Sequence, residues 1–163
     1  MAAITSHSHS VEEMGFIFFL CGFIGMLLST PLIFYRYIKH NDIPDMNKPL
    51  ICIFTALFSI LIVGYINSAQ IINTPFLITL YSIACIFYIF AFYKLIEYRN
   101  LEFYPSFSAF TFPFVISALA TKGVLGVIGK NSLLSNALLI ETAIALIIVI
   151  YVLIRYINFL KNS

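Results

Sequence analysis

The sequence predicts an all-α, polytopic membrane protein with five transmembrane helices, and two observations carry this prediction. Of its 163 residues, 61% are hydrophobic and only 10% carry charge, whereas soluble domains average roughly a quarter charged residues. Such a chain has too little polar surface to cover a globule in water. The apolar residues also form continuous runs that are long enough to cross a bilayer as helices, rather than the alternating pattern of a transmembrane barrel.

Charged residues divide this apolar sequence into spans of about 20 residues each. Runs without charge cover 14–35, 49–93 and 103–121, and a fourth run, 131–154, contains only Glu141. The second run is too long for one helix and is interrupted by the polar turn 67–74. A polar N-terminal segment, 1–13, is therefore expected before a transmembrane domain, 14–160. The five spans are expected at about 14–37, 49–68, 75–97, 105–122 and 133–157.

Lys and Arg are distributed unevenly between the two ends of the expected bundle. One end collects most of them, namely Arg36, Lys39, Lys48, Lys94, Arg99, Arg155 and Lys161. The other end has Lys122 and Lys130, which are placed in an expected loop, 122–132. Because cytoplasmic loops carry the excess of Lys and Arg, we expect a cytoplasmic C-terminus and an N-terminus outside. The expected location is a bacterial plasma membrane.

The sequence offers little support for catalysis or for a cofactor. The three cysteines, Cys21, Cys52 and Cys85, lie far apart in apolar runs and are interpreted as membrane-helix residues rather than metal ligands. His7 and His9 form a weak metal pattern, and a solvated terminus is favoured. The net charge of +2, without a basic cluster, gives no sign of nucleic-acid binding. We therefore expect no enzyme, no metal, no cofactor and no nucleic-acid partner.

The fourth span combines a proline, small residues and large rings in a pattern that suits a transport pathway. At about 100° per residue, one helix face would hold Ser108, Ala109, Phe112, Ile116, Leu119 and Gly123. Phe112 is the middle residue of its charge-free run, and its ring would fill the space beside small neighbours as a hydrophobic plug. The alternative is tight helix packing by the small residues, with Phe112 as filler.

Prolines and glycines raise separate expectations for the shape of the helices. Pro31 and Pro113 should each bend a helix, because each removes a backbone hydrogen bond. Gly123, Gly126 and Gly129 are spaced at three, which is compatible either with a continued helix or with a glycine-rich turn.

Glu141 is the one acidic residue away from the ends of the expected spans. A carboxylate at the centre of a membrane helix costs ~2.5–3.5 kcal/mol on insertion scales, so Glu141 should face protein or water. One hypothesis is a gating or proton site. The alternative is a residue near the interface that snorkels toward water or is hydrogen-bonded to Ser or Thr.

Three stretches together resemble a known family. They are the segments 31–37 (PLIFYRY), 43–50 (IPDMNKPL) and 108–120 (SAFTFPFVISALA). In this order and spacing they are similar to the C-terminal half of the tellurite-resistance/dicarboxylate transporter family. That family includes bacterial tellurite-resistance proteins, fungal malate and sulfite transporters and plant guard-cell slow anion channels. The third stretch is the most specific, with an aromatic-Thr-Phe-Pro run followed by small residues.

The resemblance implies a ten-helix anion-channel fold in which helical hairpins surround a central pore and subunits form trimers. Inner helices kinked by proline would line the pore, and a Phe on the ninth helix would close it. The five spans would then correspond to helices six to ten, and the pore gate would be Phe112. Residues 2–9 look like the tail of a missing fifth helix. The chain is therefore expected to be a truncated or split C-terminal half.

The expected function is membrane transport of small anions (dicarboxylate, tellurite, sulfite or an inorganic anion) by a channel or carrier. Pore-lining or kinking residues would be Ser108, Ala109, Pro113, Ile116 and Pro31, and the gating or proton site would be Glu141. The expected partners are the lipid bilayer, a small anion, and either an N-terminal-half chain or further copies that complete the pore. The alternative is a non-transporting membrane subunit or remnant that docks on a partner membrane protein.

Overall fold

The structure, a computed structural model, describes residues 12–39 and 43–162. These ranges contain no strand and form the elements α2 (Glu12–Lys39), η2 (Asp45–Leu50), α3 (Ile51–Ser68), α4 (Thr74–Tyr98), η3 (Pro105–Phe110), α5 (Thr111–Ile128) and α6 (Ser132–Asn162). The two η elements are 3-10 turns that lead directly into α3 and α5. Five helices in these ranges are long and apolar enough to cross a membrane, which confirms the all-α, five-span prediction.

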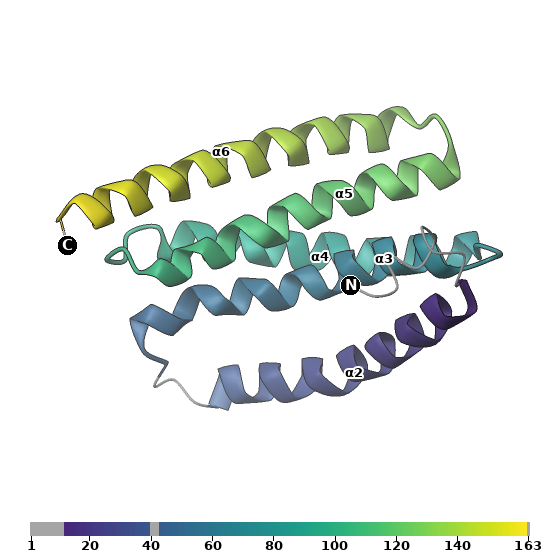
Figure 1. The fold of residues 1–163 in the computed structure, drawn as a ribbon, viewed down its shortest axis with the longest axis horizontal. Helices are drawn as coiled ribbons and strands as arrows, with labels where there is room; N and C mark the ends of the chain where they lie inside the picture. Colours follow the sequence, from purple (N-terminus) through teal and green to yellow (C-terminus); the bar gives the residue numbers. More distant parts are fainter. Residues whose placement is uncertain (1–11, 40–42, 163) are drawn as a thin grey trace.

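Successive helices run in opposite directions and pack side by side. Figure 1 shows α2 and α6 at opposite edges of the bundle, with α3, α4 and α5 between them. The helix α3 packs against α2, α4 and α5, and α5 packs against α3, α4 and α6. The central helices α3 and α5 are therefore the best covered, whereas α2, α4 and α6 expose broad apolar faces of the kind that lipid or further helices cover.

The interior consists of two clusters of buried side chains, one toward each end of the bundle. The cluster near the α3–α4 turn includes Ile62, Leu77 and Val124. The cluster near η2 and η3 is rich in aromatic rings, and Phe107, Phe110 and Phe114 are fully buried there. Because lipid tails are as apolar as these side chains, close packing rather than water exclusion holds such helices together.

The α3–α4 turn is built by polar side chains at its corner. Asn73 caps α4 by accepting a hydrogen bond from the backbone N–H of Phe76 at 3.1 Å. The backbone N–H of Asn73 in turn donates to the hydroxyl of Tyr65 at 2.9 Å. These bonds satisfy backbone groups that the helix itself cannot pair, so the polar 67–74 segment becomes a tight reversal.

The connection between α5 and α6 differs from expectation, because α5 continues beyond residue 122. Gly123 and Gly126 remain helical, and the helix ends at Gly129, whose φ of 87° suits a residue without a Cβ. Gly123 serves close packing instead, since a Cβ there would lie 3.0 Å from Cδ1 of Ile66 on α3. Lys122 consequently lies inside a helix rather than in the expected loop, 122–132.

The two hairpins repeat one plan. Each begins with a 3-10 turn of 6 residues followed by an α-helix of 18 residues. The first pair covers 45–68 and the second covers 105–128, so each position in η2–α3 has a counterpart 60 residues later in η3–α5. This internal repeat relates the two central helices to each other.

Candidate functional site

An exposed stripe runs along η3 and α5. Its members are Ser108, Phe112, Val115, Leu119, Lys122 and Gly126, and their spacing of three and four places them on one helix face. The helices α3, α4 and α6 cover the other sides of α5. The three large apolar members are between 37% and 49% exposed, with Phe112 at 37%. We refer to these six residues as the open stripe of α5.

The residues predicted to line or bend a pathway divide between this stripe and the bundle interior. Ser108 and Phe112 belong to the open stripe, whereas Ala109, Pro113 and Ile116 are buried. Ile116 packs in the cluster that joins α5 to α3 and α4. The single face expected from a regular helical wheel is therefore split, because α3 covers one side of it.

Pro31 lies apart from these residues, on the edge helix α2, where it is exposed. Its ring removes one backbone donor, yet α2 stays α-helical through Pro31 and continues to Lys39. The open stripe belongs to a central helix instead. The structure therefore does not bring Pro31 and Phe112 together within this chain.

Pro113 marks the point at which the 3-10 turn has become an α-helix. It is the third residue of α5, and its missing N–H falls where the 3-10 turn η3 passes directly into the α-helix. Nearby hydroxyls pair with carbonyl oxygens of the 3-10 turn: Ser108 donates to Pro105 at 2.9 Å, and Thr111 donates to Ser108 at 2.8 Å. Such side-chain donors satisfy backbone groups in a segment that lipid cannot hydrate.

The depth of Phe112 also differs from the expectation of a midplane residue. The span that contains it extends over Pro105–Ile128, so its middle falls between Ile116 and Ser117. Phe112 lies about 7 Å from that point, on the side of Pro105. A constriction at Phe112 would thus be closer to the end of the bundle at which most of the Lys and Arg residues gather.

Glu141 is buried between helices and belongs to a chain of hydrogen bonds across α4, α5 and α6. The hydroxyl of Thr121 donates to Oε2 of Glu141 at 2.6 Å, and the hydroxyl of Tyr81 lies 3.1 Å from the Thr121 oxygen. Since Thr121 gives its one hydrogen to Glu141, Tyr81 must be the donor to Thr121. Glu141 is therefore the final acceptor, and it faces protein.

The network of Glu141 and the open stripe occupy opposite sides of α5. Thr121 is nine residues after Phe112, and residues nine apart on an α-helix lie about 180° apart. One turn before Thr121, Ser117 pairs with Ser59 of α3 at 3.1 Å. The polar side of α5 thus fixes its rotation against three neighbouring helices, while the side with Phe112 stays open.

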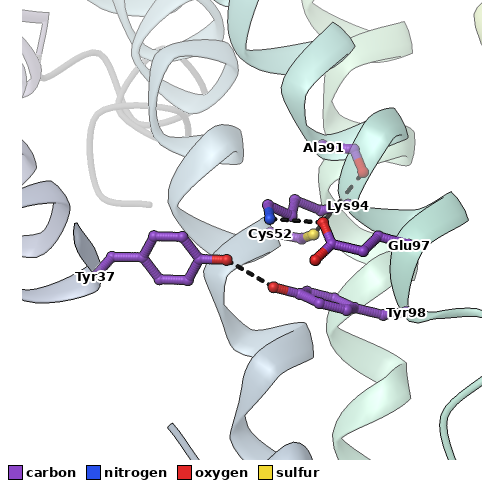
Figure 2. Close-up of polar contacts among 6 residues, drawn as sticks. All are labelled: Tyr37, Cys52, Ala91, Lys94, Glu97 and Tyr98. Carbon is purple, nitrogen blue, oxygen red and sulfur yellow. Dashed lines mark hydrogen bonds and ion pairs between the residues drawn. The ribbon is translucent and has the colours of Figure 1, made fainter. Parts of the chain in front are cut away.

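A second polar cluster joins α2 to α4 and was not foreseen from the sequence. Figure 2 shows the hydroxyls of Tyr37 and Tyr98 pointing toward each other, at 2.6 Å, and Nζ of Lys94 beside Glu97, at 2.7 Å. Four rings surround Nζ at 5.3–5.9 Å, those of Tyr37, Phe90, Tyr93 and Tyr98. The side chain of Lys94 is only 12% exposed. The spacing of Lys94, Glu97 and Tyr98 on one helix face is the signal that could have indicated it.

Arg155 forms a comparable contact on α6. Its guanidinium lies 5.8 Å from each of three ring centroids, those of Phe103, Phe107 and Tyr151, and Nη2 donates to the carbonyl of Leu101 at 3.2 Å. Cations within about 6 Å of a ring face are attracted to it. Lys94 and Arg155, which the sequence indicates only as charges that set the orientation in the membrane, therefore also hold helix ends together.

The predicted cysteine environments are mixed, and no metal-binding cluster stands out. Cys52 is buried, with Sγ 4.0 Å from the carbonyl oxygen of Ala91, Cys85 is partly covered, and Cys21 is exposed. Across residues 12–39 and 43–162, no three His, Cys, Asp or Glu side chains gather closely enough to hold a metal. His7 and His9 lie outside the described residues.

The fold and these contacts define a class of protein: an integral membrane protein of antiparallel helices, with two repeated hairpins and an open apolar stripe on a central helix. The family model described as voltage-dependent anion channel (SLAC1) matches residues 1–157. The chain belongs to this family, which confirms the resemblance to tellurite-resistance transporters and slow anion channels. Members of the family are channels or transporters rather than enzymes. No curated protein and no solved structure matches the chain.

Proposed function

We propose that this chain forms one wall of a membrane pathway for small anions, narrowed by the ring of Phe112. Membership in the anion-channel family supports the substrate class. The position of Phe112 carries the assignment of the gate: it is a large ring, 37% exposed, on the uncovered side of a helix that is packed on its other sides. A ring so placed would have to move or rotate before an anion passes.

The open stripe also holds a cation that suits anion transport. Lys122 is the only charged residue between Pro105 and Ile128, and it is exposed on the same stripe, about 15 Å from Phe112 along the helix axis. Charged residues inside membrane spans face protein or a water-filled cavity and often mark ion pathways. Lys122 would draw anions toward the end of the pathway opposite to η3.

The internal repeat supports closure of the pathway by further helices. Ser59 and Ile66 are two of the α3 residues that contact α5, at Ser117 and at Gly123 respectively. Their counterparts 60 residues later are Leu119 and Gly126, both on the open stripe. The stripe therefore contains positions that correspond to helix-packing residues, and a second group of helices, from an N-terminal-half chain or from further copies, would pack beside it and leave Phe112 and Lys122 facing the pathway.

Glu141 is proposed as the gating site that acts through α5 rather than from the pathway itself. Its carboxylate is the last acceptor in the chain from Tyr81 through Thr121. Loss of the carboxylate charge would weaken the bond from Thr121 and release one restraint on the rotation of α5. Because Phe112 lies on the opposite side of the same helix, a rotation there would move its ring.

Anion flux from proteoliposomes is the measurement that tests this proposal. Liposomes loaded with a halide-sensitive dye would hold the chain alone, or the chain together with a candidate partner that supplies further membrane hairpins. We expect flux of chloride or nitrate once the open stripe is covered, and none of sodium. If neither preparation conducts anions while the chain is folded and inserted, the chain is a non-transporting subunit that docks on a partner, which is the alternative function.

A further inference from the structure

A groove opens at the end of the bundle where α2 stops and η2 begins. Its volume is about 830 Å³, within the range of roughly 300–1,000 Å³ that ligand sites occupy. Its walls come from the last two turns of α2, from the segment 43–50 and from the first turn of α3. This is the end at which α2, α4 and α6 finish, opposite to the end that holds the α3–α4 and α5–α6 turns.

The lining changes from basic to apolar with depth in the membrane span. Arg36 and Lys48 lie within one turn of the helix ends at Lys39 and Asp45. The deeper wall is apolar and consists of Ile33, Leu50, Ile51 and Phe54. Ile33 is six residues from the end of α2, which places it about 9 Å below the rim. A ligand that fits both parts needs an anionic head and a hydrocarbon chain.

The charges at the rim favour an anion. Nζ of Lys48 lies 2.6 Å from Oδ1 of Asp45, and Arg36 is a second cation among the residues that line the groove, so the three side chains together carry a net positive charge. The guanidinium of Arg36 is the group that binds phosphate in a bidentate manner. Basic pockets between membrane helices on the cytoplasmic side bind anionic headgroups, and this is the end that the distribution of Lys and Arg predicts to be cytoplasmic.

We propose that this groove is a binding site for an anionic phospholipid. The headgroup phosphate would lie between Arg36 and Lys48, and the first part of an acyl chain would lie against Ile33, Leu50 and Phe54. The charge complementarity at the rim selects a lipid over a neighbouring apolar helix, which would leave the two cations facing hydrocarbon. The site is separate from the open stripe of α5, so it does not depend on the proposed anion pathway.

Native mass spectrometry of the delipidated, detergent-solubilised chain tests the site directly. Phosphatidylglycerol and phosphatidylcholine with identical acyl chains are titrated in parallel. We expect preferential binding of phosphatidylglycerol, and about fivefold weaker binding after Arg36→Gln, from the loss of one basic contact near a phosphate. The matched control is Arg99→Gln, because Arg99 is an exposed arginine at the same end that does not line the groove; it should bind like the unmodified chain.

A second variant tests the apolar part. Leu50 is 39% exposed and lines the groove, so a tryptophan at this position should fit without disturbing the core. We expect Leu50→Trp to weaken the binding of both lipids, while the helix content measured by circular dichroism is unchanged. Equal binding of the two lipids, an Arg36→Gln variant that binds like the unmodified chain, or an equal loss in Arg99→Gln would overturn the proposal. Two further results would overturn the proposal. One is displacement of the lipid by excess inorganic phosphate, and the other is a dimer of the chain that Leu50→Trp dissociates, because a second copy would then occupy the groove.

Discussion

The phenol oxygens of Tyr37 and Tyr98 lie 2.6 Å apart and join α2 to α4 directly. This bond matters because α2 is otherwise held mainly by α3 and exposes most of its span. Tyr98 is buried, and both rings also face Nζ of Lys94. This hydrogen bond, at one end of the bundle, therefore fixes the edge helix α2 against α4.

Replacement of this hydroxyl should loosen α2. We expect Tyr37→Phe to lower the free energy of unfolding by about 0.5–1.5 kcal/mol, the usual net value of one hydrogen bond. Reversible unfolding in mixed micelles measures the change. Tyr35→Phe is the control. Tyr35 is an exposed tyrosine on the same helix turn, and within the described residues its hydroxyl accepts a hydrogen bond from Lys39 of the same helix. Equal effects of both changes would show that the hydrogen bond between Tyr37 and Tyr98 does not hold α2.

Two glycines in α5 should respond oppositely to a side chain. A Cβ at Gly126 would meet no atom of another described segment within 4 Å, whereas a Cβ at Gly123 would lie 3.0 Å from Ile66. We expect Gly126→Ala to stabilise the isolated chain by about 0.5–1 kcal/mol through helix propensity. Gly123→Leu should cost about 1–3 kcal/mol by overpacking. Unfolding in mixed micelles compares the stability of the two variants. If Gly126→Ala destabilises the purified chain instead, the added methyl group must meet a further helix that packs on the open stripe.

Removal of the ring at Phe112 should widen the proposed pathway. We expect Phe112→Ala to raise anion flux several-fold in the assembly that conducts, and Phe112→Trp to lower it. Phe92→Ala is a closely matched control, because Phe92 is 38% exposed but belongs to α4. Flux that is unchanged across the Phe112 series, or that rises equally with Phe92→Ala, would indicate that Phe112 is a packing residue.

The charge of Lys122 should set selectivity rather than opening. We expect Lys122→Gln to lower anion flux and Lys122→Glu to lower it further, because the cation raises the local concentration of anions near the pathway. Both effects should shrink at high salt, which screens the charge. Lys130→Gln serves as the control, since Lys130 lies just beyond the end of α5. Reversal potentials across a salt gradient report the selectivity, and an unchanged potential in Lys122→Glu would remove this residue from the pathway.

Glu141→Gln should alter the pH dependence of flux while leaving the fold intact. The amide oxygen of Gln can still accept the hydrogen bond that Thr121 now donates at 2.6 Å, but it cannot gain or lose a proton. We expect flux in the unmodified protein to rise on acidification, because protonation weakens the bond that restrains α5, and flux in the variant to stay constant. Glu97→Gln provides a comparison at an exposed acid of α4. Identical pH profiles for the unmodified protein and Glu141→Gln would assign Glu141 a packing role only.

The sequence by itself determined the number and type of the spans, because continuous apolar runs between charged residues leave a helix as the only structure that satisfies its own backbone in lipid. It also indicated the family, through three stretches, the last of which contains the Thr-Phe-Pro run at 111–113. Helical spacing placed Phe112 and Ala109 on a common face, since periodicity can be read from one helix alone.

Only the tertiary structure decided which of these residues are covered. Ala109 is buried in η3, which packs mainly against η2, and Ile116 is buried where α5 packs against α3, whereas Phe112 stays exposed. The hydrogen-bond partner of Glu141, Thr121, is 20 residues away in the sequence. The contact of Tyr37 with Tyr98 bridges 61 residues. A periodic pattern specifies the faces of one helix, but the neighbour that each face meets depends on how distant segments pack, and that information is not local in the sequence.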